Sequence, residues 1–100
     1  MLNIVKNQNG ANLTVSLEGR LDTSTAPQLE GELRQLLDGT NGLVIDMAKL
    51  AYISSAGLRV LLTTHKTMSK KGGMTIKNVN KDIMEIFDVT GFADILNIEE

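Results

Sequence analysis

The strongest constraint on the fold is a strand-like segment that leads into a helix-like one. The run Gly42–Asp46 is nearly all apolar and closes in an acid, as expected of a central strand covered on both faces of a sheet. Beyond the adjacent Ser54 and Ser55, apolar residues recur at the spacing of one helix face: Leu58, Leu61, Leu62 and Met68. A buried strand followed by an amphipathic helix is typical of an α/β fold.

A hairpin opens the chain. Asn9-Gly10 is a turn signal between the segments Leu2–Asn7 and Ala11–Leu17. Apolar and polar residues alternate in the second segment, which predicts a strand with one buried face.

The first helix is expected to begin beside Thr25. Thr25 and Gln28 fit a capping box, and Pro27 is tolerated in a first turn. The helix should end near Asp38-Gly39. Its buried face is expected to comprise Ala26, Leu29, Leu33, Leu36 and Leu37.

Glycines mark the ends of the later elements. We expect a second helix from about Ser55 to Lys70, a strand at Met74–Lys77, a third helix capped by Asn80 and closed near Gly91, a helical turn at Phe92–Ile95 and an edge strand at Leu96–Ile98. This order predicts an α/β layer fold in which a mixed β-sheet of about four to five strands packs with three to four α-helices. Right-handed crossovers should leave the helices over the sheet.

The composition describes one domain, residues 1–100, and argues against several kinds of chemistry. With 42% hydrophobic residues the chain can build a core without disulfides. It has no cysteine, and therefore no thiolate nucleophile or thiolate metal site. Its one histidine, His65, cannot form a two-histidine metal site or proton relay. We expect no cofactor and no metal.

Charge and hydropathy limit the kinds of partner. The net charge is −2, the basic residues are scattered, and Tyr52, Phe87 and Phe92 are the only aromatics, which argues against direct nucleic-acid binding. No apolar run approaches the ~18 residues of a membrane span. The first residues alternate like a strand and lack the apolar region of a signal peptide. We expect a cytoplasmic protein without direct membrane contact.

Ser54 and Ser55 stand where the second helix begins, and two roles are open to them. The N–H groups of a first turn lack intrahelical partners, and the helix dipole there favours negative charge. One hydroxyl is expected to cap the helix, worth ~0.5–2 kcal/mol against alanine. The small Ala56 and Gly57 leave the turn accessible, which favours a modifiable or partner-contacting serine. A serine hydrolase is not expected, because the Gly-x-Ser-x-Gly frame is missing and His65 lies roughly three turns along the helix.

Two acids follow predicted strands. Asp22 precedes a helix as Ser55 does, so both are expected at the same end of the sheet, where partners of α/β folds bind. Asp22 could instead cap the first helix. Asp46 is expected to accept backbone hydrogen bonds in a loop over Met47–Ala51.

A row of cations lies on the polar face of the second helix: Arg59, Lys66 and Lys70. Such a row is either a solvated surface or a site that receives an acidic partner. The turn Lys70–Gly73 lacks the frame of a phosphate-binding loop.

Five segments, in this order and at this spacing, are similar to a known family: Gly19–Asp22, Leu43–Met47, Tyr52–Leu58, Lys71–Gly73 and Thr90–Phe92. Together they resemble the STAS domain, and more closely the stand-alone anti-sigma factor antagonists of bacteria. The resemblance implies a STAS-type single domain with a partner-switching role. In this family the unphosphorylated domain binds an anti-sigma factor, usually a serine kinase, and so frees a sigma factor. Phosphorylation by the kinase ends the complex, and a serine phosphatase restores it.

The resemblance also assigns residues. The phosphorylated serine of the family lies in an Asp-Ser-Ser/Thr-Gly-like turn, and matching on Gly57 places it at Ser55, with Ser54 as a second candidate. Ser54 stands where the family has the acid, and Ala56 where it has the next hydroxyl. The implied partner surface comprises Asp22, Thr23, Ser24, Thr25, Ser54, Ser55, Ala56, Gly57 and Arg59.

Two hypotheses of function follow. The first is a phosphorylatable anti-sigma factor antagonist. The second is a STAS-type accessory or scaffold subunit of a transporter or signalling complex, without phosphorylation control. Co-purification with a serine kinase would favour the first, and with a transporter ATPase the second. An enzyme is not expected, because no paired acid and base stands out.

Overall fold

The structure, a computed structural model, describes residues 1–99. Its elements in chain order are β1 (Leu2–Asn9), β2 (Asn12–Leu21), α1 (Ala26–Leu36), η1 (Leu37–Gly39), β3 (Gly42–Ile53), α2 (Ser55–Met68), β4 (Met74–Lys77), α3 (Lys81–Thr90), η2 (Phe92–Asp94) and β5 (Asn97–Glu99). The two η elements are single turns of 3-10 helix. This order confirms the predicted α/β class, including the opening hairpin and the short helical turn before the last strand.

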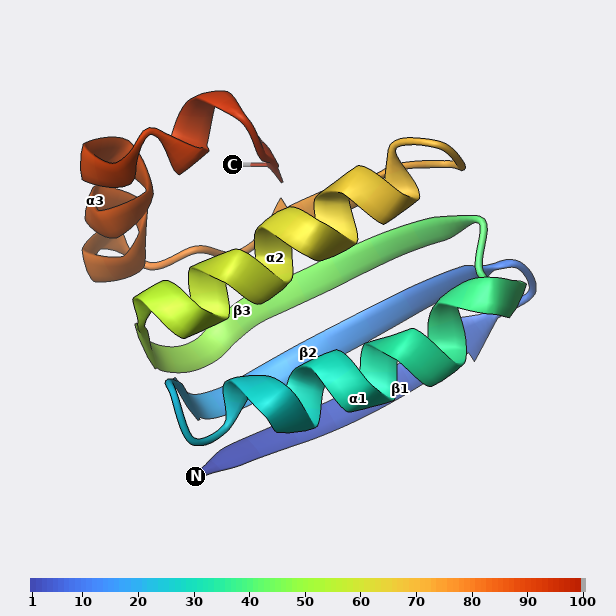
Figure 1. Cartoon of the computed structure of the whole chain (residues 1–100), viewed down its shortest axis with the longest axis horizontal. Helices are drawn as coiled ribbons and strands as arrows, with labels where there is room; N and C mark the ends of the chain where they lie inside the picture. The colour runs from blue at the N-terminus through green and yellow to red at the C-terminus, as the bar shows by residue number, and fades with distance from the viewer. Residues whose placement is uncertain (100) are drawn as a thin grey trace.

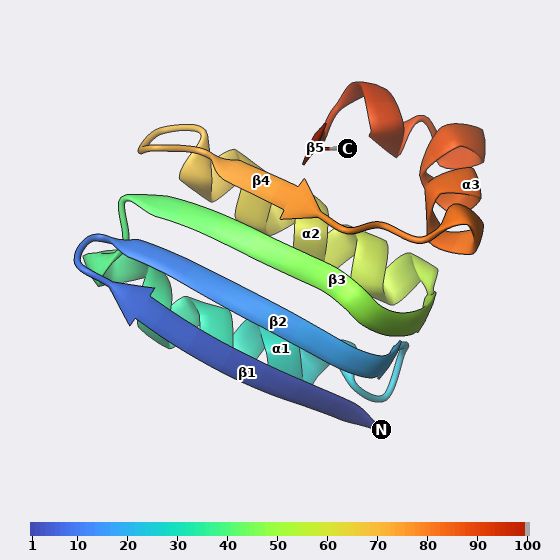
Figure 2. The same cartoon turned by 180° about the vertical axis from the view of Figure 1, so that it is seen from behind.

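The strands form one mixed sheet in the order β1-β2-β3-β4-β5. β1 and β2 are antiparallel, and every later neighbouring pair is parallel. Because the parallel strands advance across the sheet in one direction, right-handed crossovers place their helices on one face. Figure 1 shows α1 and α2 in front of the sheet, and Figure 2 shows the opposite face, which no helix of residues 1–99 covers.

The prediction that β3 is covered on both faces is therefore wrong. Leu43, Ile45 and Met47 are buried beneath the helices, whereas Val44 and Asp46 are half-buried on the open face. An apolar run reveals that a strand is central, but it does not reveal on which side the connections pass. That side follows from the strand order.

β3 also extends beyond its predicted end at Asp46, so the expected loop over Met47–Ala51 is wrong as well. Within β3, only Leu43–Asp46 pairs with β4, and the rest of the strand pairs with β2 alone. The β2–β3 register shifts twice along this stretch. The later part of β3 can therefore contain several exposed residues, because it has a strand on one side only and its pairing with β2 is irregular.

The core lies between the sheet and the helices. Its largest fully buried side chains include Phe87 of α3 together with leucines and isoleucines of β2, β3 and α2. Asn80 caps α3 as predicted, since its Oδ1 accepts the Ile83 N–H at 2.8 Å, and Gly91 ends the helix with φ of 81°. No α-helix among residues 1–99 combines the length and apolar character needed to cross a lipid bilayer.

The Lys71–Gly73 segment ties two turns together at the end of the sheet where β3 begins. The Lys71 ammonium donates to the carbonyl of Leu37, and the Gly72 N–H donates to the carbonyl of Asn41 at 2.6 Å. These bonds join the α2–β4 turn to the segment that enters β3. This segment therefore has an internal structural role.

Candidate functional site

Two turns lie side by side where β2 and β3 end. Leu21 and Ile53 are the last paired residues of these parallel strands, and the Ser54 N–H donates to the Leu21 carbonyl at 2.9 Å. We call the segments that follow, Asp22–Thr25 and Ser54–Ser55, the paired turns. As Figure 1 shows, α1 and α2 both start at this end of the molecule. The prediction that Asp22 and Ser55 share one end of the sheet is confirmed.

Ser54 and Ser55 have different environments. Ser54 is half-buried at the N-cap of α2, and its Oγ accepts the Gly57 N–H at 3.5 Å. Ser55 is the first residue of α2 and is exposed. Among residues 1–99 its hydroxyl makes no hydrogen bond. Ser54 therefore has the capping role, and the Ser55 hydroxyl stays available to other molecules.

Gly57 has an internal role rather than an external one. It is buried, and a Cβ at this position would lie 2.7 Å from Leu21 Cγ and 2.9 Å from Ile53 Cγ1. The small residue lets α2 pack closely on the ends of β2 and β3. The expectation that Gly57 is small to keep the turn accessible is therefore wrong, while Ala56 is half-buried beside it.

The first of the paired turns is held by Asp22 and Thr25. Asp22 Oδ1 accepts the Ser24 hydroxyl at 2.8 Å, the Ser24 N–H at 3.0 Å and the Thr25 N–H at 3.1 Å. The Thr25 hydroxyl donates to the Arg20 carbonyl at 2.8 Å and accepts the Asp22 N–H at 2.8 Å. The carboxylate thus serves the turn before α1 rather than the helix itself.

The predicted capping box of α1 is wrong for the same reason. Thr25 occupies the N-cap position, but its side chain makes no cap bond because it is committed to the turn. The Gln28 amide reaches back to the Leu2 carbonyl at 3.4 Å. The alternative prediction, that Asp22 caps this helix, is also wrong, because Thr25 occupies the N-cap position.

Hydrogen bonding stabilises the ionised form of Asp22. The Ser24 hydroxyl is the main cause that lowers the pKa of this carboxyl below its ordinary value of 3.8. Desolvation opposes it, and the N–H groups of Thr25 and Ser24 add to the lowering. Asp22 is therefore an anion at neutral pH, with its Oδ1 directed into the turn.

Arg20 and Tyr52 are two neighbours of the paired turns that the sequence prediction missed. They are paired across β2 and β3, and the Arg20 guanidinium carbon lies 4.3 Å from the centre of the Tyr52 ring. Arg20 Nε also lies 3.7 Å from Asp22 Oδ2. No signal for this contact was available in the sequence, because the predicted strands ended at Leu17 and Asp46, before either residue.

A groove between α1 and α2 adjoins the paired turns. It measures about 190 Å³ and includes the predicted surface residues Thr23, Ala56 and Arg59. Its other lining residues are Ala26, Pro27, Glu30, Val60 and Thr63. Of the remaining predicted residues, Ser24 is exposed, whereas Thr25 and Gly57 are buried.

The other predicted polar residues lie elsewhere. Asp46 is on the open face, where the Asn78 amide (3.0 Å) and the Ala48 N–H (2.9 Å) bind its Oδ1, and the Asn78 bond chiefly lowers its pKa. His65 is half-buried in α2, and Lys66 is exposed. No group of three His, Cys, Asp or Glu side chains within residues 1–99 is arranged to hold a metal ion.

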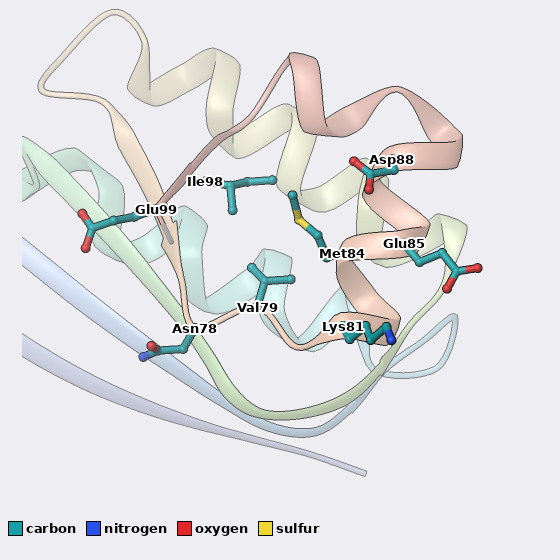
Figure 3. Close-up of a pocket in the computed structure, with 8 residues that line it drawn as sticks. All are labelled: Asn78, Val79, Lys81, Met84, Glu85, Asp88, Ile98 and Glu99. Atoms are coloured by element: carbon teal, nitrogen blue, oxygen red, sulfur yellow. The ribbon is translucent and has the colours of Figure 1, made fainter.

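A hollow larger than the groove between α1 and α2 lies away from the paired turns. It measures about 620 Å³ and lies between α3 and the β4–β5 edge. Figure 3 shows the apolar side chains of Val79, Met84 and Ile98 gathered at its centre. None of the predicted site residues lines it.

Comparison with known proteins gives a consistent result. A model of the STAS domain matches residues 3–100. The anti-sigma-B factor antagonist of Bacillus subtilis (strain 168) is 32% identical over 98 residues, which is 97% of this chain and 90% of that protein.

Solved structures share the fold. The crystal structure of an anti-sigma factor antagonist from Mycobacterium paratuberculosis aligns with a TM-score of 0.88 at 23% identity, covering 98% of this chain and 85% of that one. The Bacillus cell fate determinant SpoIIAA in its phosphorylated form aligns with a TM-score of 0.75 at 13% identity, covering 98% and 92% of the two chains.

Proposed function

The chain belongs to the STAS domain family, and from this premise we propose that it is an anti-sigma factor antagonist whose binding is switched by phosphorylation of Ser55. Its partner is an anti-sigma factor with serine kinase activity, and a serine phosphatase reverses the modification. Its role is regulatory rather than catalytic, within one STAS domain. We place it in the cytoplasm, where the ATP that the kinase uses is available.

The observation that carries the proposal is the free hydroxyl of Ser55. It is exposed at the first position of α2, while the neighbouring Ser54 caps the helix. The Bacillus subtilis relative, which matches almost the whole chain, bears the name anti-sigma-B factor antagonist. A kinase could therefore reach Ser55 without disturbing the cap.

The fold should tolerate a phosphate at this position. The group adds about −1.5 to −2 charges, and the N-terminus of a helix favours negative charge. The first turn of α2 contains no acidic residue that would oppose it. Arg59 is one turn along the same helix and is exposed, so its charge also favours the anion.

A docked partner should not tolerate the phosphate. The charge would lose its water in the interface, and a penalty of ~2.8 kcal/mol already weakens binding about a hundredfold. We therefore infer a switch that acts through the charge of the interface and leaves the fold unchanged.

The test compares the affinity of the wild type, Ser55→Ala and Ser55→Asp for the anti-sigma factor kinase. Ser55→Ala should bind like the wild type, and Ser55→Asp should bind at least about tenfold more weakly. Thr67→Asp is the matched control, because Thr67 is an exposed residue about 18 Å along the same helix. Equal binding by Ser55→Asp and the wild type would reject the proposal.

A second measurement addresses the modification itself. After incubation with the kinase and ATP, the intact mass should rise by one phosphate in the wild type and in Ser54→Ala, but not in Ser55→Ala. Phosphate retained by Ser55→Ala would move the site to another hydroxyl.

A further inference from the structure

Arg20 is held in place beside the paired turns while staying open to solvent. The Tyr52 ring lies under its guanidinium at 4.3 Å, and Asp22 Oδ2 lies 3.7 Å from its Nε. Even so, 54% of the Arg20 side chain and 37% of Tyr52 are exposed. A side chain that is ordered before binding loses less conformational entropy when a partner docks.

The guanidinium keeps its donors for another molecule. An arginine side chain carries five N–H donors, and within residues 1–99 that of Arg20 makes no hydrogen bond. Its remaining contacts are the Tyr52 ring and the Asp22 carboxylate, which hold it in position. The planar fork of terminal N–H groups matches a carboxylate through two parallel hydrogen bonds.

The surroundings of Arg20 also favour an acidic occupant. The first turns of α1 and α2 contain no acidic residue, so neither turn itself holds a negative side chain that would repel an acidic partner. Asp22 is the only acid of the paired turns, and its charge faces Arg20. Glu30, on the wall of the adjoining groove, pairs with Arg34 at 3.6 Å.

We propose that Arg20 is a charged anchor of the docking surface and that it receives an Asp or Glu side chain of the anti-sigma factor. The inference rests on the proposed function. It adds Arg20, near the end of β2, to a docking surface made of the paired turns and the groove between α1 and α2. Tyr52 is a positioning residue that holds the guanidinium. A phosphate on Ser55 would then repel the same partner carboxylate.

The experiment measures association rate and Kd by surface plasmon resonance at low and high salt. The partner is chosen from the purified anti-sigma factor kinases of the same genome as the one that binds the wild type most tightly. At low salt Arg20→Gln should weaken binding about tenfold, mainly through slower association, and the loss should shrink at high salt. Lys81→Gln removes the charge of an exposed lysine at the start of α3, away from the paired turns, and should stay within about twofold of the wild type.

Variants of Tyr52 separate positioning from folding. Tyr52→Phe keeps the ring beneath the guanidinium and should bind within about twofold of the wild type. Tyr52→Leu should lose affinity in the same salt-dependent way as Arg20→Gln, with a circular dichroism spectrum like that of the wild type.

The outcomes distinguish this inference from the proposed function. Arg20→Gln binding like the wild type at both salt concentrations would overturn the inference alone. A loss of affinity that salt does not change would also overturn it, since the contact would not be a charge pair. If the wild type itself binds none of the kinases, the proposed function fails and the inference fails with it.

Discussion

At the scale of single residues, neighbouring polar side chains in and beside the paired turns have different roles. Ser54 caps α2 and Ser55 is free, although the two are identical in type and adjacent in sequence. Asp22 and Arg20 are both charged, but Asp22 is bonded into its turn while Arg20 remains exposed. The position of each Cα relative to the strand ends decides which hydroxyl or charge a partner can reach.

Gly57→Ala should destabilise the protein by about 1–2 kcal/mol in urea unfolding, because the new methyl group would overlap Leu21 and Ile53. The usual gain of ~1 kcal/mol for replacing a helix glycine by alanine offsets only part of this cost.

Gly31→Ala is the matched control for that prediction. Gly31 lies inside α1, and a Cβ there would meet nothing within 4 Å. This variant should therefore gain about 0.5–1 kcal/mol. If both variants gain stability equally, close packing at Gly57 is not what requires a glycine.

At the scale of elements, one side chain at the start of α3 adds a polar link between this helix and the sheet, beside the core packing of Ile83 and Phe87. The Asn80 Oδ1 accepts the Ile83 N–H, and its Nδ2 donates to the Leu50 carbonyl at 2.8 Å. The same residue therefore caps the helix and joins it to the extended part of β3. A helix of 10 residues has little stability by itself, so such bonds matter more than its propensity.

Asn80→Ala should cost about 1–2 kcal/mol of unfolding free energy, since it removes a cap and a hydrogen bond to a carbonyl. Asn80→Ser keeps a capping oxygen and should recover part of the loss. Urea unfolding of the two variants checks this order, and equal stability of Asn80→Ala and the wild type would contradict it.

At the scale of the whole molecule, the helices pack on one face of the sheet. This arrangement leaves accessible to solvent both the surfaces that a partner can reach and the carboxylates whose protonation makes stability depend on pH. The helices cover one face, the other stays open, and the paired turns lie together at the end of β2 and β3 (Figures 1 and 2). Asp22 and Asp46, on different parts of this surface, both have a pKa lowered by hydrogen bonds to neutral donors. The folded protein therefore holds these protons less tightly than the unfolded chain does.

This difference predicts the pH dependence of stability. Because the pKa of each carboxyl is lower in the folded state, its stabilising contribution is complete above the ordinary value of 3.8 and is lost as pH falls through the folded value. Urea unfolding between pH 7 and pH 3 should show the advantage of the wild type over Asp22→Asn shrinking in acid. A constant difference across this range would contradict the lowered pKa of Asp22.

The sequence by itself determined the order of the elements, the Asn80 cap of α3 and the placing of Asp22 and Ser55 at one end. These features depend on local periodicity, on turn residues and on the direction of parallel strands. Only the tertiary structure decided that Gly57 packs inward, that Thr25 serves a turn rather than a helix, and that Arg20 lies on Tyr52. These depend on the register between β2 and β3 and on the distance at which α2 crosses them. Contacts between residues far apart in the chain leave no periodic pattern in either segment alone. The same reason explains why the open face of β3 could not be predicted from its apolar residues.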